Sequence, residues 1–139
     1  MVARLSSGWV VMGEQQVFAG YCMLLPDPVV GHLNELKPAA RAQFLSDMAL
    51  AGDALLAATQ ALRINYAMLG NVEPALHAHL FPRSAAEPEA MRSAHPWAAD
   101  WNRAPRYSEE GYGGLKLRIA SEITARSPLG AAQVMPVHK

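Results

Sequence analysis

The chain has 139 residues, of which 51% are hydrophobic and 17% are charged, so a polar disordered chain is excluded and the length suits a single domain. Twelve lysines and arginines balance twelve aspartates and glutamates, and this zero net charge predicts neither nucleic-acid binding nor attachment to a membrane. The single cysteine, Cys22, excludes an intramolecular disulfide and a cysteine-rich zinc site, and we expect it in the core.

No segment of the sequence has the features of a membrane or export signal. No apolar run approaches the roughly 20 residues that a membrane-spanning helix needs. The first residues, Met1 to Gly8, lack the apolar stretch of a signal peptide. We therefore expect a cytoplasmic protein.

Two apolar segments near the N-terminus predict two or three strands joined by tight turns. Residues 9–12 form a short β-branched run, and residues 15–25 resume the apolar character after a turn. Pro26 and Pro28 then predict the end of the strand, because proline has no N–H to donate to a strand ladder.

Residues 38–63 give the strongest helix signal. Pro38 suits the first helical position, where a missing N–H costs nothing. Apolar side chains then recur at three- and four-residue steps and predict one face packed on the core. Gly52 lies within that stripe, and close packing against a sheet would account for it.

The second half of the chain predicts two strands and one shorter helix. Residues 64–69 and 76–81 are apolar runs separated by turn-forming residues. Residues 82–114 show no clear period and predict a loop segment. A four-residue apolar repeat then predicts a short amphipathic helix that ends before Pro128.

This order of elements predicts a fold of the α+β class. We expect an antiparallel sheet, since short turns join most of its strands, with one long helix packed on it and a short C-terminal helix. The predicted domain spans residues 1–128, and residues 129–139 are predicted to be a flexible tail.

Two histidines in the last predicted strand are candidates for chemistry. His77 and His79 are two residues apart, so a strand would point both imidazoles to one face, about 7 Å from each other. Imidazole titrates near neutral pH, and such a pair can share one phosphate group or a metal ion. Three interpretations stay open at this point: a half-buried structural pair, a metal site that needs at least one further ligand, and a catalytic pair.

The surrounding segments resemble the histidine triad superfamily of nucleotide hydrolases and transferases, in particular its bacterial branch described as diadenosine-tetraphosphate-hydrolase-like. Residues 20–25 resemble that branch's strand before the first helix, residues 42–53 its long helix, and residues 65–71 its next strand and turn. Residues 74–83, with the sequence PALHAHLFPR, resemble the triad motif and its Pro-Arg. The family pattern has three alternating histidines, and Ala75 stands in place of the first.

The resemblance implies a role for each matching residue. His77 matches the histidine that attacks the α-phosphate and forms a covalent nucleotidyl-histidine, and His79 matches the one that contacts the phosphate. Asn71 matches a polar residue on the preceding turn, near the leaving oxygen. Asn65 matches an asparagine that borders the pocket, with a structural hydrogen bond as the alternative. Arg83 contacts phosphate or is a solvated surface charge.

A second departure from the family pattern concerns the segment before the long helix. Many members carry a histidine there, and alignment on residues 20–22 places Val29 at that position, with His32 a partial substitute. One preorganised charge-stabilising donor contributes roughly 3 kcal/mol to catalysis. Loss of two such contacts predicts either a slow enzyme or a nucleotide-binding protein with little or no catalysis.

The resemblance also implies the ligand and the assembly. We expect a nucleotide or a dinucleoside polyphosphate as partner, no metal or other cofactor, and a homodimer that pairs through the long helix and an adjoining strand. The wide apolar stripe of that helix agrees with a second contact surface; its members are Phe44, Leu45, Met48, Ala51, Leu55 and Ala58. Trp97 and Trp101 either stack on a base or pack over the sheet.

Overall fold

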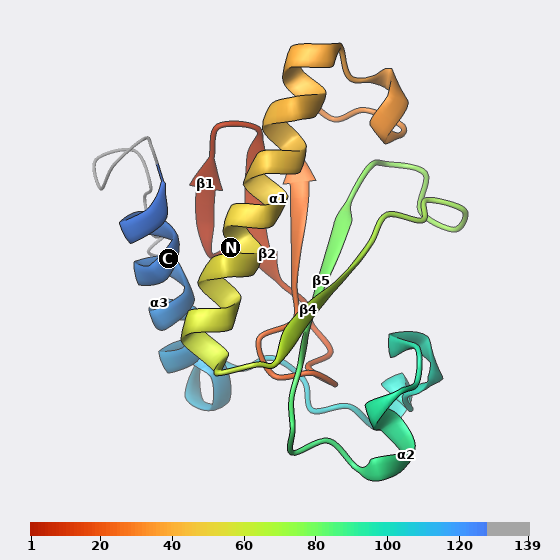
Figure 1. The fold of residues 1–139 in the computed structure, drawn as a ribbon, viewed down its shortest axis with the longest axis vertical. Coiled ribbons are helices and arrows are strands. Elements are labelled where there is room, and N and C mark those ends of the chain that lie inside the picture. The colour runs from red at the N-terminus through yellow and green to blue at the C-terminus, as the bar shows by residue number, and fades with distance from the viewer. Residues whose placement is uncertain (128–139) are drawn as a thin grey trace.

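The structure is a computed structural model that describes residues 1–127, and the predicted tail at 129–139 lies outside this range. Within the described residues, five strands form one antiparallel sheet in the spatial order β1-β2-β3-β5-β4 (Figure 1). The strands are β1 (Ala3–Leu5), β2 (Gly8–Met12), β3 (Cys22–Pro26), β4 (Arg63–Ala67) and β5 (Ala78–Arg83). The predicted α+β class and antiparallel sheet are therefore confirmed.

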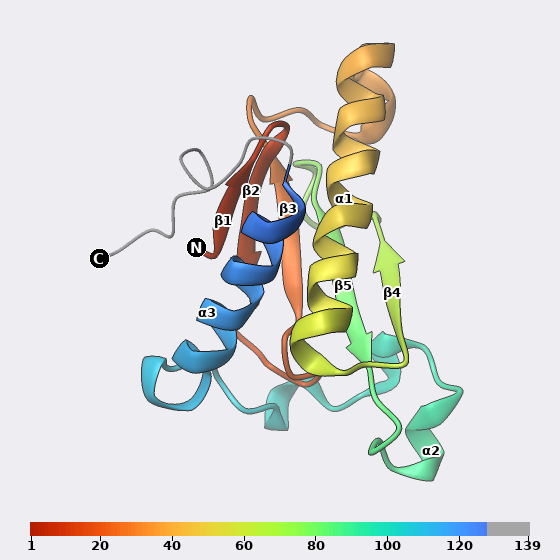
Figure 2. The ribbon, with the colours of Figure 1, turned by 60° about the vertical axis from the view of Figure 1, so that its left-hand side comes forward.

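Two helices cover one face of this sheet. They are α1 (Pro38–Thr59) and α3 (Glu109–Arg126), and Figure 2 shows them side by side in front of the strands. The short helices α2 (Glu89–Arg92), η1 (Leu33–Glu35), η2 (Pro96–Ala98) and η3 (Trp101–Arg103) lie in the connections. No helix among the described residues is long and apolar enough to cross a membrane.

The core lies between the sheet and the two long helices. Alternate strand residues point into it, as the two-residue period of a strand requires. Its fully buried members include Val10, Cys22, Leu24, Leu80, Phe44, Leu55, Ile119 and Ile123. The prediction that Cys22 is a core residue is confirmed, since its side chain is completely buried.

Helix α1 begins at the predicted residue, Pro38, and ends four residues before the predicted end. Pro38 occupies the first turn, and Gln60 ends the helix in the left-handed conformation with φ of 58°, so the helix does not reach Arg63. The prediction that Gly52 packs closely is confirmed, because a Cβ atom there would lie 1.9 Å from the Tyr66 hydroxyl of β4.

Strand β5 begins two residues later than predicted and continues through a proline. His77 therefore precedes the strand, while His79 lies within it. Pro82 pairs with β4 on one side, whereas the pairing with β3 extends only to Leu80. The missing N–H of Pro82 thus costs no hydrogen bond on the β3 side, which is why this proline does not end the strand.

Two elements were not predicted at their observed positions. Strand β1 precedes the first predicted strand, and residues 15–21 form a loop instead of strand. Helix α3 begins at Glu109, well before the predicted start at Leu115, and Ser108 caps it by accepting a hydrogen bond from the N–H of Gly111 at 3.0 Å. The first turns of α3 contain several glycines, which have low helix propensity and no apolar side chain. Apolar periodicity therefore does not predict the start of this helix.

Candidate functional site

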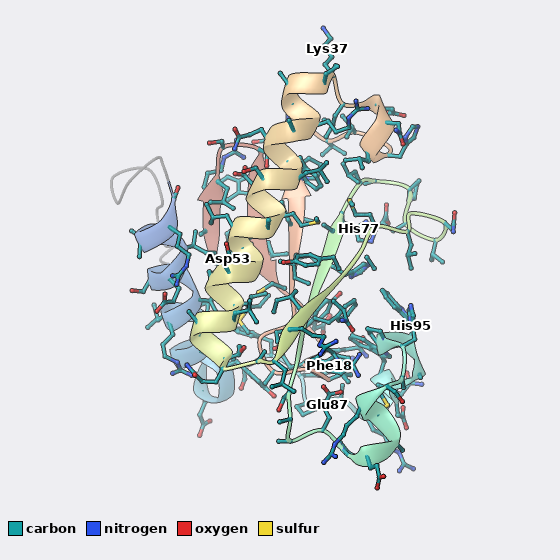
Figure 3. The ribbon with its side chains drawn as sticks, in the orientation of Figure 1. Phe18, Lys37, Asp53, His77, Glu87 and His95 are labelled. Carbon is teal, nitrogen blue, oxygen red and sulfur yellow. The ribbon has the colours of Figure 1, made fainter. Side chains whose placement is uncertain are left out.

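The histidine pair lies on the face of the sheet opposite the two long helices. The rings of His77 and His79 meet with their centroids 4.7 Å apart and their planes at 80°. Figure 3 labels His77 where the β4–β5 loop enters β5, with Phe18 and Glu87 at the other end of the strand. The two imidazoles therefore meet as predicted, although His77 lies just before β5 and the rings are closer than the spacing within a strand implies.

The hydrogen bond of His77 decides which of its nitrogens is free. His77 Nδ1 lies 2.7 Å from the carbonyl oxygen of Ala75. A carbonyl oxygen only accepts, so Nδ1 carries the proton and donates it to this bond. Nε2 of the neutral ring therefore keeps an unshared electron pair. Ala75 thus acts on His77 through its backbone carbonyl.

His79 is held in the opposite tautomer by Tyr21. The Tyr21 hydroxyl lies 2.6 Å from His79 Nδ1. Burial raises the pKa of Tyr21 well above its ordinary value, so the hydroxyl stays protonated and donates to Nδ1. Burial, and then the neighbouring His77, lower the pKa of His79 to about 4. His79 is therefore neutral at pH 7 and carries its one proton on Nε2.

The two histidines consequently offer complementary chemistry at adjacent positions. His77 presents a nucleophilic nitrogen, and His79 presents an N–H donor. His79 is uncharged at neutral pH, so it adds no positive charge beside His77 in the free protein. Such a pair can attack an electrophilic phosphorus atom and hold one of its oxygens.

Aromatic rings pack around His79 and fix its orientation. Tyr21 and Phe81 lie nearly parallel to its ring, with interplanar angles of 16° and 10°. Trp97 meets the same ring edge to face, with centroids 5.0 Å apart. Trp101 packs over the sheet against Phe81 and Tyr21, so the packing alternative for Trp101 is confirmed.

The loop that carries Tyr21 is organised by the buried side chain of Gln16. Its Nε2 donates to the carbonyls of Gly13 and Tyr21 at 2.7 and 3.0 Å, and its Oε1 accepts from the N–H of Gly20 at 2.9 Å. A buried amide with all its partners in place is rigid, because any displacement leaves polar groups unpaired. Tyr21 is thus presented to His79 by a fixed loop.

Arg83 and Asn65 meet each other away from the histidines. Arg83 lies four residues beyond His79 on β5, about 13 Å along the strand. Its Nη1 donates to Asn65 Oδ1 at 2.8 Å and to the carbonyl of Ala94 at 3.0 Å. Its other N–H groups bind the Glu87 carboxylate and the carbonyl of Met91. All five N–H groups therefore have acceptors within the protein, and the side chain is 9% exposed.

The remaining candidate positions lie on loops. Asn71 is exposed in the β4–β5 connection. Val29 is 75% exposed, and the bond from the Leu76 N–H to the Val30 carbonyl, at 2.8 Å, places its segment beside the chain that leads to His77. His32 points to Glu35 at 3.5 Å and has no described contact with the pair. Within residues 1–127, no three or more histidine, cysteine, aspartate or glutamate side chains are placed to hold a metal ion.

Tyr21 was missed by the sequence analysis. Its contact with His79 depends on strand register, since the pairing of Met23 with His79 brings the residues before β3 alongside Phe81. The available signal was an aromatic residue that carries a hydroxyl group directly before an apolar strand. That signal indicates that the hydroxyl is partly buried and forms a hydrogen bond, but it does not identify the residue to which it bonds.

The antiparallel sheet with two helices on one face has the same fold as solved structures of histidine triad proteins. A histidine triad protein from Bradyrhizobium japonicum matches with a TM-score of 0.77 and 19% identity over 88% of each chain. One from Marinobacter aquaeolei matches with a TM-score of 0.78 and 17% identity over 91% of this chain and 89% of that one. No family model and no curated protein matches.

A third similar structure is a hypothetical histidine triad nucleotide-binding protein from Sulfolobus tokodaii. It matches with a TM-score of 0.64 and 18% identity, over 82% of this chain and 76% of that one. At these identities the likeness establishes the fold of the chain. The chemistry rests on the geometry of the chain's own residues.

Proposed function

We propose that the protein hydrolyses or transfers a nucleotidyl group through a covalent nucleotidyl-histidine on His77. The observation that carries this proposal is the bond from His77 Nδ1 to the Ala75 carbonyl, which leaves Nε2 as a nucleophile on a ring whose centroid lies 4.7 Å from that of His79. The likeness to a protein named as nucleotide-binding supports a nucleotide as the substrate.

The first chemical step forms a phosphorus–nitrogen bond. The electron pair of His77 Nε2 attacks the α-phosphorus, and the bond from that phosphorus to the leaving group breaks with its electron pair on the leaving group. The imidazole then bears substituents on both nitrogens and is positively charged. The Ala75 carbonyl stabilises this charge, because a hydrogen bond from a cationic donor is stronger than one from a neutral donor.

The second step regenerates the histidine. A water oxygen bonds to phosphorus, the phosphorus–nitrogen bond returns its electron pair to Nε2, and one proton of the water is released. An acceptor other than water gives nucleotidyl transfer instead. In both steps the N–H of His79 donates to a non-bridging phosphoryl oxygen and stabilises the charge that accumulates there.

A nucleotide-binding protein with little or no catalysis is the second candidate. The observation that favours it is the chemistry of the two substituted positions. Ala75 contributes only its backbone carbonyl, and Val29 offers an exposed apolar side chain where a phosphate contact is expected. Nucleotide binding without product in a sensitive turnover assay would support this candidate over the first.

Trapping of the covalent intermediate tests the leading proposal. The protein is incubated with an adenylated substrate, quenched and digested, and mass spectrometry locates the added nucleotidyl group. We expect the group on His77 and none in His77→Ala. Arg103→Ala is a suitable control, since that side chain is 90% exposed. Full activity in His77→Ala would overturn the assignment of the nucleophile.

We also propose that the protein is a homodimer. The argument rests on the edge strand β4 and not on the apolar stripe of α1 that the sequence suggested. Phe44, Ala51 and Leu55 of that stripe are buried within the protomer, so they offer no free surface. Strand β4 is instead the open edge of the sheet beside β5, and its flank exposes Leu62 (66%) and Tyr66 (42%). An unpaired edge with exposed apolar side chains is suited to pairing with a second copy.

A further inference from the structure

A pocket of about 480 Å³ opens at the end of the sheet away from His77. Figure 3 labels two of its lining residues, Phe18 and Glu87, near the far end of β5. Its walls come from the β2–β3 loop, the last turn of α1, the segment that follows β5 and the first half of α3. None of its lining residues takes part in the proposed mechanism, so this pocket is separate from the histidine site.

Close packing fixes the walls of this pocket relative to one another. Gly20 of the β2–β3 loop packs against α1 and β5, where a Cβ atom would lie 2.7 Å from Thr59 Cγ2 and 3.4 Å from Pro82 Cγ. The N–H of Gly20 donates to the buried side chain of Gln16 at 2.9 Å. The pocket is therefore preformed, and its volume lies in the range of about 300–1,000 Å³ that is usual for small-molecule sites.

Most of the side chains that line the pocket are apolar. They include Val17 and Phe18 on the β2–β3 loop, Ala58 on α1, Pro82 on β5 and Leu115 on α3. The ring of Phe18 is held in place, because it also meets Phe81 and Trp101 edge to face, with centroid distances of 5.8 and 6.2 Å. Such walls favour a ligand with an apolar body, since removal of apolar surface from water is favourable.

The polar side chains of the pocket differ in whether they have partners. The Glu87 carboxylate accepts a hydrogen bond from Arg83 Nη2 at 2.8 Å, and the Thr59 hydroxyl donates to the carbonyl of Leu55 at 2.6 Å. Arg118, in contrast, is exposed, and its guanidinium group has no hydrogen bond or ion pair with any of residues 1–127. Arg118 is therefore the unpaired charge of this lining.

The carbonyl groups at the end of α1 do not neutralise this charge. The N–H of Gln60 donates to the carbonyl of Leu56 at 3.1 Å, and its side-chain Nε2 donates to the carbonyl of Ala57 at 3.0 Å. These two carbonyls thus have donors from the helix end itself. The guanidinium group of Arg118 keeps its N–H donors for a ligand that enters the pocket.

We propose that this pocket binds a small monocarboxylate, whose carboxylate pairs with Arg118 while its apolar body lies against Val17, Phe18 and Leu115. The planar guanidinium group matches a carboxylate in shape and can donate two parallel hydrogen bonds to it. One unpaired charge favours a singly charged ligand, because a dianion would bring a second charge out of water without a partner. This site does not rest on the proposed function.

Calorimetry with octanoate, octanamide and acetate tests the two parts of this site. Octanamide keeps the apolar body and lacks the charge, whereas acetate keeps the charge and lacks the body. We expect octanoate to bind about threefold to fivefold more tightly than octanamide, as an ion pair with an exposed arginine allows. Acetate should not bind at the same concentrations. Equal Kd values for octanoate and octanamide, or no binding of octanoate at millimolar concentration, would overturn the proposal.

Arg118→Gln should raise the Kd of octanoate by the same factor and leave that of octanamide unchanged. Because Arg118 is exposed and has no side-chain partner among residues 1–127, this change keeps the fold. Arg126→Gln, on the same helix but outside the pocket, is the matched control and should leave both Kd values unchanged. Ala61→Leu adds a larger side chain to the pocket wall and should weaken both ligands.

Three results with the variants would overturn the site. They are unchanged octanoate binding in Arg118→Gln, a loss of octanoate binding in Arg126→Gln, and a loss of it in His77→Ala, which would place the acid at the histidines. The covalent labelling of His77 uses none of the residues of this pocket, so the proposed function and the carboxylate site can each fail without the other.

Discussion

The hydroxyl of Tyr21 lies 2.6 Å from Nδ1 of His79, and the two rings stack with an interplanar angle of 16°. One tyrosine therefore sets both the plane of the imidazole and the nitrogen that carries its proton. In the proposed mechanism Tyr21 is a positioning residue, since it acts only through His79.

Tyr21→Phe should keep the stacking and lose the hydrogen bond. We expect turnover to fall by up to about tenfold, because a neutral hydrogen bond contributes about 1 kcal/mol. Nitrogen-15 NMR should show His79 as a mixture of tautomers in place of one. Tyr112→Phe on α3 is the control; a single unchanged tautomer in Tyr21→Phe would contradict the positioning role.

The lowered pKa of His79, about 4 from an ordinary 6.5, predicts a pH dependence of stability. Between these values the unfolded chain binds a proton that the folded protein excludes, so the free energy of unfolding falls as the pH drops from about 6.5 towards 4. Urea unfolding at pH 7 and pH 5 should show a larger loss in the parent protein than in His79→Gln. Equal losses would contradict the shift.

Adding histidines at positions 75 and 29 should raise turnover if the proposed mechanism holds. The double variant Ala75→His and Val29→His adds two imidazoles at the positions where the proposed site lacks side-chain contacts to phosphate. Val29 is 75% exposed, so a larger polar side chain fits there without repacking. Steady-state kinetics of the double variant and of each single variant measure the gain; no gain in the double variant counts against the proposal that the site lacks phosphate contacts at these two positions.

Gly52→Ala should destabilise the protein even though alanine favours helix. The added methyl group would lie 1.9 Å from the Tyr66 hydroxyl, and such overpacking costs about 1–3 kcal/mol, against a helical gain of about 1 kcal/mol. Thermal unfolding should therefore show a lower Tm, partly recovered when Tyr66→Phe is added. A higher Tm in Gly52→Ala would show that the tyrosine moves aside freely.

The dimer predicts a mass of twice 15.0 kDa by light scattering at micromolar concentration. Tyr66→Arg places a charge on the exposed flank of β4 and should shift the protein towards the monomer. A mass near 15 kDa in the parent protein across a tenfold dilution series, begun well above micromolar, would remove the proposal.

Apolar periodicity predicted the sheet, the long helix and the meeting of His77 with His79, because these depend on local spacing. The partners of buried charges were not predictable in the same way. Asp47 is 2% exposed and accepts from the N–H and hydroxyl of Ser7 at 2.8 and 2.6 Å, forty residues away. Neither residue carries a local signal for that contact, and the bond becomes visible only when the β1–β2 turn packs on α1.

Arg83 holds together segments of the chain that are distant in the sequence. Its five N–H groups hold Asn65, Glu87 and two carbonyls of the segment that leads to Trp97. Lysine offers three donors from a single point and cannot reproduce this planar arrangement. Arg83 is therefore accounted for by the chain segments that it anchors, and its position after the histidines does not by itself identify a protein that handles phosphate.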